Sequence, residues 1–209
     1  MKRSPVLPRL IAVGAVALMA AGCITLLPKT KPVELYRFGQ PVAAGTVTAT
    51  PGTVGVFRST GSFQQESAGD RLLTLTAGQV AYVAETRWVA PAAVLWDAAV
   101  LAAFDADPGR ARIISRGEPG TASYVLRLDV RNFEAHYDNG SKAAPTVVVR
   151  VRAAMTGGSD RRQIGERIFE ARVPAAENRI SSILPAYDRA VAAVLQDIVA
   201  WTNEQAAPV

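Results

Sequence analysis

Cys23 has the most distinctive chemistry in this chain, because it is the only cysteine among 209 residues. Its thiol is a nucleophile that can be modified covalently. Cys23 ends an uncharged stretch, 10–22, which follows a basic start that includes Lys2 and Arg3. A basic start, a short apolar stretch and small residues before a cleavage point are typical of a secretory signal. We therefore expect the signal peptide 1–22 to be removed, which leaves Cys23 as the first residue.

The small residues before Cys23, which are Ala20, Ala21 and Gly22, resemble the lipobox of bacterial lipoproteins. In that family the cysteine thiol receives a diacylglyceryl group, the signal is cut before it, and the new amine is acylated. The resemblance implies lipidation of Cys23, although Ala20 stands where lipoboxes usually carry leucine. By resemblance to lipoproteins of Gram-negative bacteria, Ile24 in place of aspartate after the cysteine implies an outer-membrane anchor and a domain that faces the periplasm.

Two other interpretations of this segment remain open. Cys23 would also suit an ordinary buried position, since free cysteine packs like a small hydrophobe. The uncharged stretch extends over 10–27, which only just reaches the roughly 18–20 residues that a membrane-spanning helix needs. Gly14, Gly22 and Pro28 disfavour that helix.

His136 is the lone histidine, and we expect it to be an ordinary residue at a strand end. Without a second histidine or cysteine, metal sites with nitrogen or sulfur ligands lack enough ligands. The sequence has no Gly-x-Ser-x-Gly nucleophile elbow and no Gly-x-x-x-x-Gly-Lys phosphate loop. The spacing of Glu166 and Glu170 predicts solvated residues on one side of a strand. We therefore expect no enzyme, no metal and no cofactor.

The formal charge of +5 overstates how basic the protein is, because three cations leave with the signal. The remaining charge is about +2, and the sequence has no run of Lys and Arg with interleaved aromatics. Nucleic-acid binding therefore has little support. A single cysteine also excludes a disulfide framework. The number of subunits stays open, a homo-oligomer included.

The alternation of apolar residues predicts mostly strands. A helix that opens at Pro91 interrupts them, with Val94, Leu95, Ala98, Leu101 and Phe104 on its apolar face and a stop at 107–109. We expect three long strands between 124 and 173 to form an antiparallel meander with one buried and one cationic face, with a bulge near Asn132. Strands are expected at 33–38, 53–58, 70–76, 79–86, 111–115, 124–133, 147–155 and 164–173.

A last helix is predicted from a clear apolar stripe, with Pro185 as a point where it would kink or restart. Its first residue cannot be placed from the pattern. We expect an α+β fold with a single domain over 33–205, following a tether over 23–32. In that domain two main helices pack on one face of an antiparallel-rich mixed sheet. The stripe consists of Tyr187, Val191, Val194, Leu195, Ile198 and Trp201.

The strand over 79–86 runs into Arg87 and Trp88, and Pro91 and an amphipathic helix follow. This order resembles the ABC-type transport auxiliary lipoproteins of the paraquat-inducible protein C-like kind. The resemblance extends over nearly all of the chain after Cys23. Further matching segments are 36–38, 124–134, 147–155 and the helix that closes on Trp201.

The resemblance implies an auxiliary component of a lipid transport system, with no catalytic residues. Its implied partners are a substrate-binding protein of the mammalian-cell-entry type and an ABC permease and ATPase. A structural or assembly lipoprotein of the envelope and a periplasmic lipid-binding carrier are the alternatives.

Arg87 and Trp88 could form a partner interface, since arginine and tryptophan are enriched at binding hot spots. The simpler interpretation is that Trp88 fills the core. Arg127, Arg150 and Arg152 would either attract anionic headgroups or line a solvated strand face.

Overall fold

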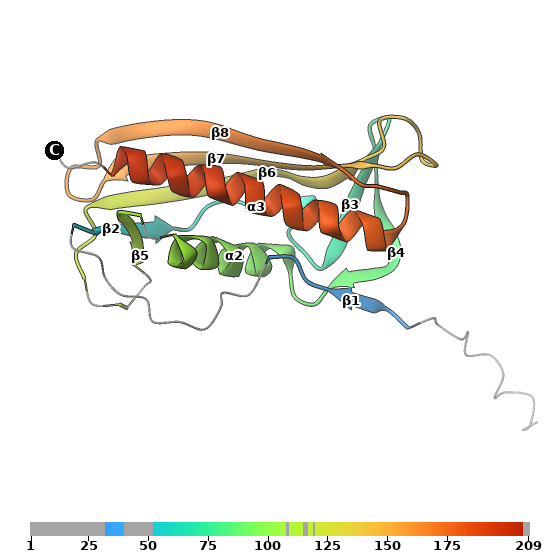
Figure 1. The fold of residues 1–209 in the computed structure, drawn as a ribbon, viewed down its shortest axis with the longest axis horizontal. Coiled ribbons are helices and arrows are strands. Elements are labelled where there is room, and N and C mark those ends of the chain that lie inside the picture. Colours follow the sequence, from blue (N-terminus) through green and yellow to red (C-terminus); the bar gives the residue numbers. More distant parts are fainter. Residues whose placement is uncertain (1–31, 40–51, 108, 115–116, 119, 207–209) are drawn as a thin grey trace, which may run out of the picture. The chain divides into compact units, whose positions relative to one another are not determined.

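Three long antiparallel strands form the centre of the fold: β6 (Tyr124–His136), β7 (Thr146–Gly157) and β8 (Gln163–Pro174) (Figure 1). One face of β7 is fully buried, as its alternating sequence predicts, and carries Val147, Val149, Val151, Ala153 and Met155. The structure is a computed structural model that describes residues 32–39, 52–107, 109–114, 117–118 and 120–206. The predicted signal peptide, Cys23 and most of the predicted tether lie outside these residues.

Five shorter strands complete one mixed, eight-stranded sheet along the other edge of β6. β2 (Val54–Ser59) lies parallel to the start of β6 and pairs in turn with β5 (Ala111–Ile114). β3 (Arg71–Thr76) lies parallel to the end of β6, followed by β4 (Gln79–Trp88) and then β1 (Glu34–Tyr36). The meander thus carries two small strand groups, one at each end of β6.

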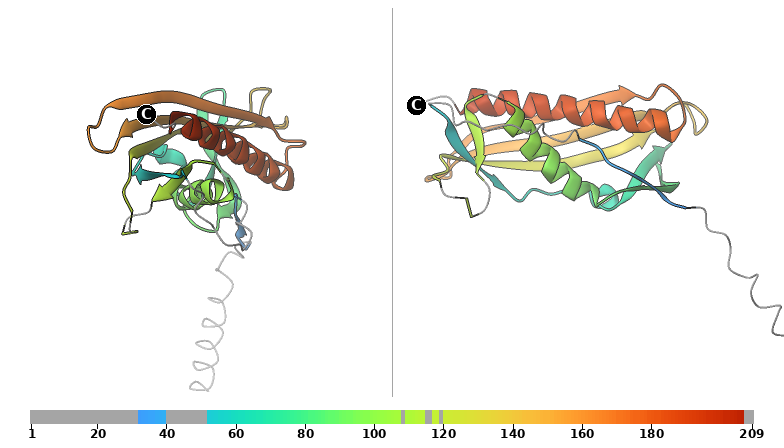
Figure 2. Two further views of the ribbon diagram at one scale, coloured as in Figure 1. Left: turned by 60° about the vertical axis from the view of Figure 1, so that its left-hand side comes forward. Right: turned by 60° about the horizontal axis from the view of Figure 1, so that its bottom comes forward.

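Two helices pack on one face of this sheet, α2 (Ala92–Ala106) and α3 (Ile180–Gln205) (Figure 2). α3 packs along β7 and β8, and α2 contacts α3 and β5. A short 3-10 helix, η2 (Gln65–Ser67), lies between β2 and β3 in the chain. The α+β class, the mixed sheet and the two helices are as predicted.

The bulge predicted in β6 is present, because the pairing of β6 with β7 shifts register between Val130 and Asn132. The shift moves Phe133 onto the buried face, where Leu126, Leu128 and Val130 already lie. Without it the strict alternation of a strand would turn Phe133 to the other side.

α3 begins at Ile180 and runs through Pro185 without a break. Pro185 lies in the second turn, where its ring removes the hydrogen bond to the Ser181 carbonyl. Burial of Ile183, Ala186 and Tyr187 around it offsets that loss. The predicted apolar stripe is confirmed, because all six of its residues are buried.

The predicted apolar face of α2 is only partly correct. Leu95 and Phe104 are buried, but Val94 and Ala98 are exposed. The buried side is instead formed by Ala92, Leu95, Trp96, Ala99, Val100 and Phe104. The residues of α2 are apolar nearly all the way round the helix, so periodicity alone could not select its buried face. Its only polar residues, Asp97 and Asp105, lie on the solvent side.

Candidate functional site

Trp88, one of the two residues predicted for a partner interface, lies in the core and is 2% exposed. Its ring packs edge to face against Phe38 at 5.0 Å and against Tyr187 at 5.3 Å between ring centroids. Phe133 contacts the same rings. These four residues form an aromatic cluster that joins the N-terminal segment, β4, β6 and α3. Such pairs add about 0.5–1.5 kcal/mol each beyond burial, so Trp88 stabilises the fold.

Arg87 points to the opposite face of β4, because neighbouring side chains of a strand alternate. Its Nη1 lies 2.7 Å from Oδ2 of Asp70, and both side chains are about two-fifths exposed. The structure therefore does not bring Arg87 and Trp88 together on one surface. A partner contact at this pair stays a prediction, and Arg87 would carry it.

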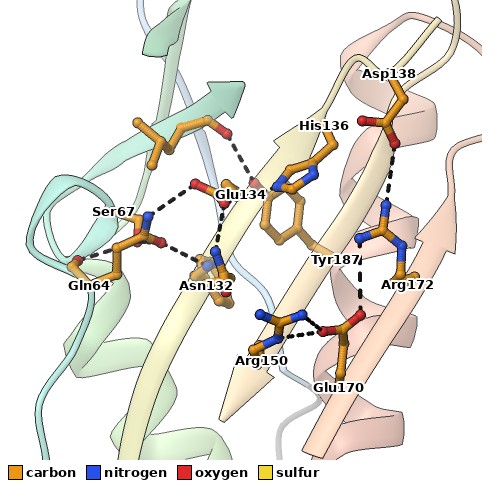
Figure 3. A network of polar contacts seen from close by, with 12 residues as sticks. Gln64, Ser67, Asn132, Glu134, His136, Asp138, Arg150, Glu170, Arg172 and Tyr187 are labelled. Atoms are coloured by element: carbon orange, nitrogen blue, oxygen red, sulfur yellow. Dashed lines mark hydrogen bonds and ion pairs between the residues drawn. The ribbon is translucent and has the colours of Figure 1, made fainter. Parts of the chain in front are cut away.

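The outer face of the sheet, opposite the helices, holds a polar network around Glu134 (Figure 3). The carboxylate is 4% exposed, and it accepts hydrogen bonds from Asn132 Nδ2 at 2.9 Å and from Gln64 Nε2 at 3.0 Å. Nε2 of His136 lies 2.9 Å from the same carboxylate. Burial alone would raise the pKa of Glu134, but the hydrogen bonds from His136, Gln64 and Asn132 hold its pKa below the usual value.

Gln64 connects this carboxylate to the bulge in β6. Its Oε1 accepts hydrogen bonds from the Phe133 N–H at 2.9 Å and from Ser67 Oγ at 3.0 Å. Its own backbone N–H donates to the Val130 carbonyl at 2.8 Å. The bulge leaves the Phe133 N–H for this side chain to satisfy, since a displaced residue cannot complete the ladder. Gln64 thus fastens the loop before β3 onto β6.

A second buried carboxylate, Asp129, holds the start of the same loop. It accepts hydrogen bonds from both the backbone N–H and the hydroxyl of Ser62, each at 2.9 Å, and from Arg127 Nε at 3.0 Å. Burial alone would raise the pKa of Asp129, but the contacts from Ser62 and Arg127 outweigh it and lower the pKa. Arg152 lies 3.2 Å away and completes the pairing.

Four arginines of the outer face pair with carboxylates: Arg127, Arg150, Arg152 and Arg172. Arg152 pairs with Glu166 at 2.6 Å, and Arg150 pairs with Glu170. Arg172 lies between Glu170 and Asp138. Hydrogen bonding by Arg152 lowers the pKa of Glu166. Ion pairs therefore neutralise much of the cationic surface that the strand pattern predicts.

Sequence reasoning missed Gln64, Asp129 and Glu134 as organising residues. The strand pattern puts Asp129 on the polar face of β6, and the loop that covers this residue comes from 67 positions away. The predicted bulge near Asn132 is the one local signal that the backbone there needs an outside partner. His136 ends β6, as predicted, although its contact with Glu134 was not foreseen.

The chemistry of this network is structural. Within the part of the chain that the structure describes, no group of three His, Cys, Asp or Glu side chains could hold a metal ion. Both buried carboxylates have their acceptor oxygens occupied by donors from the loop and from β6 itself. The network therefore fixes a loop to the sheet.

The fold defines a class: a small α+β domain with one open mixed sheet and two helices on a single face. A family model described as the ABC-type transport auxiliary lipoprotein component matches residues 69–199, and the chain belongs to this family. The matched residues run from the loop before β3 into α3, and so include Arg87, Trp88 and both buried carboxylates. Membership associates the chain with an ABC-type transport system of the cell envelope.

Solved structures agree with this fold. A crystal structure from Xanthomonas campestris, assigned to the DUF330 family model, is similar with a TM-score of 0.69 and 21% identity, covering 82% of this chain and 95% of that chain. A second crystal structure, of an uncharacterized protein, has a TM-score of 0.62 and 13% identity, with 82% and 99% covered. No curated protein matches the sequence. None of the helices in the described residues is both long and apolar enough to cross a membrane.

Proposed function

We propose that the chain is a periplasmic lipoprotein, anchored to the outer membrane through acylated Cys23, that serves as the auxiliary component of an ABC-type lipid transport system. The family match over 69–199 carries this proposal. Its partners would be a substrate-binding protein of the mammalian-cell-entry type and the ABC permease and ATPase. Cys23, at the end of an uncharged N-terminal stretch, supplies the attachment site that a lipoprotein needs.

The anchor accounts for membrane attachment without a spanning helix. Each buried methylene contributes about 0.8 kcal/mol, and a single myristoyl chain binds only marginally. A cysteine that carries several acyl chains would hold the protein on the bilayer. Ile24 after the cysteine supports the outer membrane as the destination.

The folded domain would act by binding rather than by catalysis. Its buried titratable groups are committed to contacts within the fold, as Glu134 and Asp129 show. Its core between sheet and helices is filled by aromatic and aliphatic side chains such as Trp88, Tyr187 and Met155. We therefore propose an adaptor that is fixed to the membrane at one end and grips a periplasmic partner with the domain.

Co-purification from cross-linked membranes tests this function. The full chain with a C-terminal affinity tag is isolated, and the proteins bound to it are identified by mass spectrometry. We expect a mammalian-cell-entry protein and its permease, and their absence would contradict the adaptor role. Capture of assembly factors alone would favour a structural lipoprotein, and lipid extracted with the purified domain would favour a carrier. Cys23→Ala is the matched control for membrane anchoring.

A further inference from the structure

Large apolar side chains are exposed at one end of the sheet. Seven such side chains are found among the described residues, and five of them lie in β1, in β4 or beside those strands, each between 41% and 61% exposed. We call this set the β1–β4 surface. It consists of Val33, Leu35, Val80, Tyr82 and Val89.

Strand register places the side chains near β1 on a single face. Leu35 lies opposite Arg87, and Arg87 lies opposite Arg71. The pairing of β3 with β4 shifts register between Arg71 and Leu73, so register does not extend this face to Tyr82. Paired residues share a face of the sheet, and so do residues two apart in one strand. The Arg71 guanidinium lies 5.1 Å from the centre of the Tyr82 ring, which places Tyr82 beside Arg71.

Next to β1, the opposite side of β4 is already covered. Trp88 of β4 is buried in the aromatic cluster, and its register partner Tyr36 packs against the core. Beside β1, the β1–β4 surface is therefore the outer side of a sheet whose inner side is filled. Farther along β4, both sides are open, because all residues over 79–82 are exposed. It also differs from the outer side of the meander, where paired charges such as Arg152 and Glu166 predominate.

The anchor brings this surface close to a bilayer. Val33 lies ten positions after Cys23, and an extended chain spans at most about 3.3–3.6 Å per residue, or roughly 35 Å in all. An acyl chain on Cys23 thus holds β1 within about one domain diameter of the headgroups. The tether adds two cations, Lys29 and Lys31, which anionic lipids attract.

We propose that the β1–β4 surface rests on the membrane and sets the orientation of the domain, an inference that depends on the acyl anchor of the proposed function. Aliphatic side chains with a tyrosine and flanking arginines suit the boundary between headgroups and acyl chains. Leu35 and Val89 would enter that boundary, with Arg71 and Arg87 beside them at headgroup level. The outer face of the meander and the helices stay available to a protein partner.

Quenching by brominated lipid tests this contact. Once Cys23 is acylated, a cysteine introduced by Leu35→Cys is the only free thiol, and it can carry a bimane label. The full lipidated chain is placed in phosphatidylethanolamine–phosphatidylglycerol vesicles with and without bromine on the acyl chains. We expect bromine to reduce the fluorescence at position 35 by roughly twofold or more, since such side chains insert at the acyl boundary.

Ile168→Cys is the matched control, because Ile168 is exposed to a similar degree, at 54%, but lies on β8 at the other edge of the sheet. Its label should keep the same fluorescence in both kinds of vesicle. Val89→Cys gives a second reporter on the β1–β4 surface, which guards against a local effect of the Leu35 variant.

The outcomes separate this inference from the anchor. If chains float with brominated vesicles but the labels at positions 35 and 89 stay bright, the membrane contact is overturned and the anchor is left intact. Chains that do not float overturn both. A third outcome is that brominated lipid does not quench the labels, while native envelope membranes protect them from quenching by iodide. This result would assign the surface to a protein partner and would also overturn the proposal.

Discussion

Nε2 of Gln64 lies 3.0 Å from Oε2 of Glu134, which joins two residues 70 positions apart in the chain. The same amide accepts the Phe133 N–H through its oxygen. One side chain therefore satisfies both a buried carboxylate and the backbone group that the bulge exposes. The loop between β2 and β3 depends on this contact for its position.

Replacing Gln64 by Ala should destabilise the domain by about 2–3 kcal/mol, because a buried donor and a buried charge both lose a partner. Urea unfolding of the wild-type and variant chains measures the loss. Gln65→Ala is the control, since that neighbouring side chain is exposed. Equal midpoints for the two variants would show that the amide contact has no energetic role.

The stability should depend on pH through Glu134. The pKa of Glu134 is lower in the folded state than in the unfolded state. Its contribution to the free energy of unfolding is therefore fully present at neutral pH. That contribution is lost as the pH falls from the ordinary carboxyl pKa through the folded-state pKa. Glu134→Gln should be less stable than wild type at pH 7, and this difference should shrink toward about pH 3. Thermal unfolding across that range provides the measurement. Glu177→Gln, at an exposed ion pair with Arg179, should change stability little at any pH.

Gly61→Ala should be among the most damaging small substitutions. A Cβ at this position would lie 1.7 Å from the backbone carbonyl oxygen of Leu128, and a backbone atom cannot move aside cheaply. We expect a loss of about 2–3 kcal/mol or more in the free energy of unfolding. Gly69→Ala is the matched control, because nothing lies within 4 Å of its Cβ. A Gly61 variant as stable as the Gly69 variant would contradict the close approach of loop and strand.

Substitutions of Arg87 and of Trp88 should affect different properties of the protein. Trp88→Ala should cost about 3–5 kcal/mol, because it removes a buried ring from the aromatic cluster. Arg87→Ala should cost no more than about 1 kcal/mol, since its ion pair with Asp70 is partly exposed. Co-purification of partners with the stable Arg87 variant then tests the predicted contact: a reduced yield at unchanged stability supports it, and an unchanged yield excludes it.

Localisation tests the anchor directly. Cys23→Ala should release the protein from the membrane fraction, because no acyl chains would then be attached. Ile24→Asp should leave lipidation in place and shift the protein to the inner-membrane fraction of a density gradient. Mass spectrometry of the wild-type N-terminal peptide provides the chemical check, and an intact Met1 terminus would rule out lipidation.

Local patterns predicted those parts of the fold in which one residue type dominates a face. The valines of β7 and the stripe of α3 are such cases, and the bulge in β6 follows from the changed phase at Phe133. α2 is apolar nearly all round, so its buried face depends on where the sheet lies. The carboxylates Asp129 and Glu134 have the residue types of a solvated strand face. Only the long-range return of the loop over them makes them buried, and no local spacing encodes that contact.

The short pairing of β1 with β4 also bears on mechanics. Tension on a membrane-attached amino terminus would reach the domain first at Glu34–Tyr36, which pairs with β4 over three residues. Phe38 follows directly and is held in the aromatic cluster. Peeling β1 away would therefore load the ring contacts of Phe38 before any strand of the meander is pulled. The domain can thus give up its first strand under load and keep β6, β7, β8 and α3 in place.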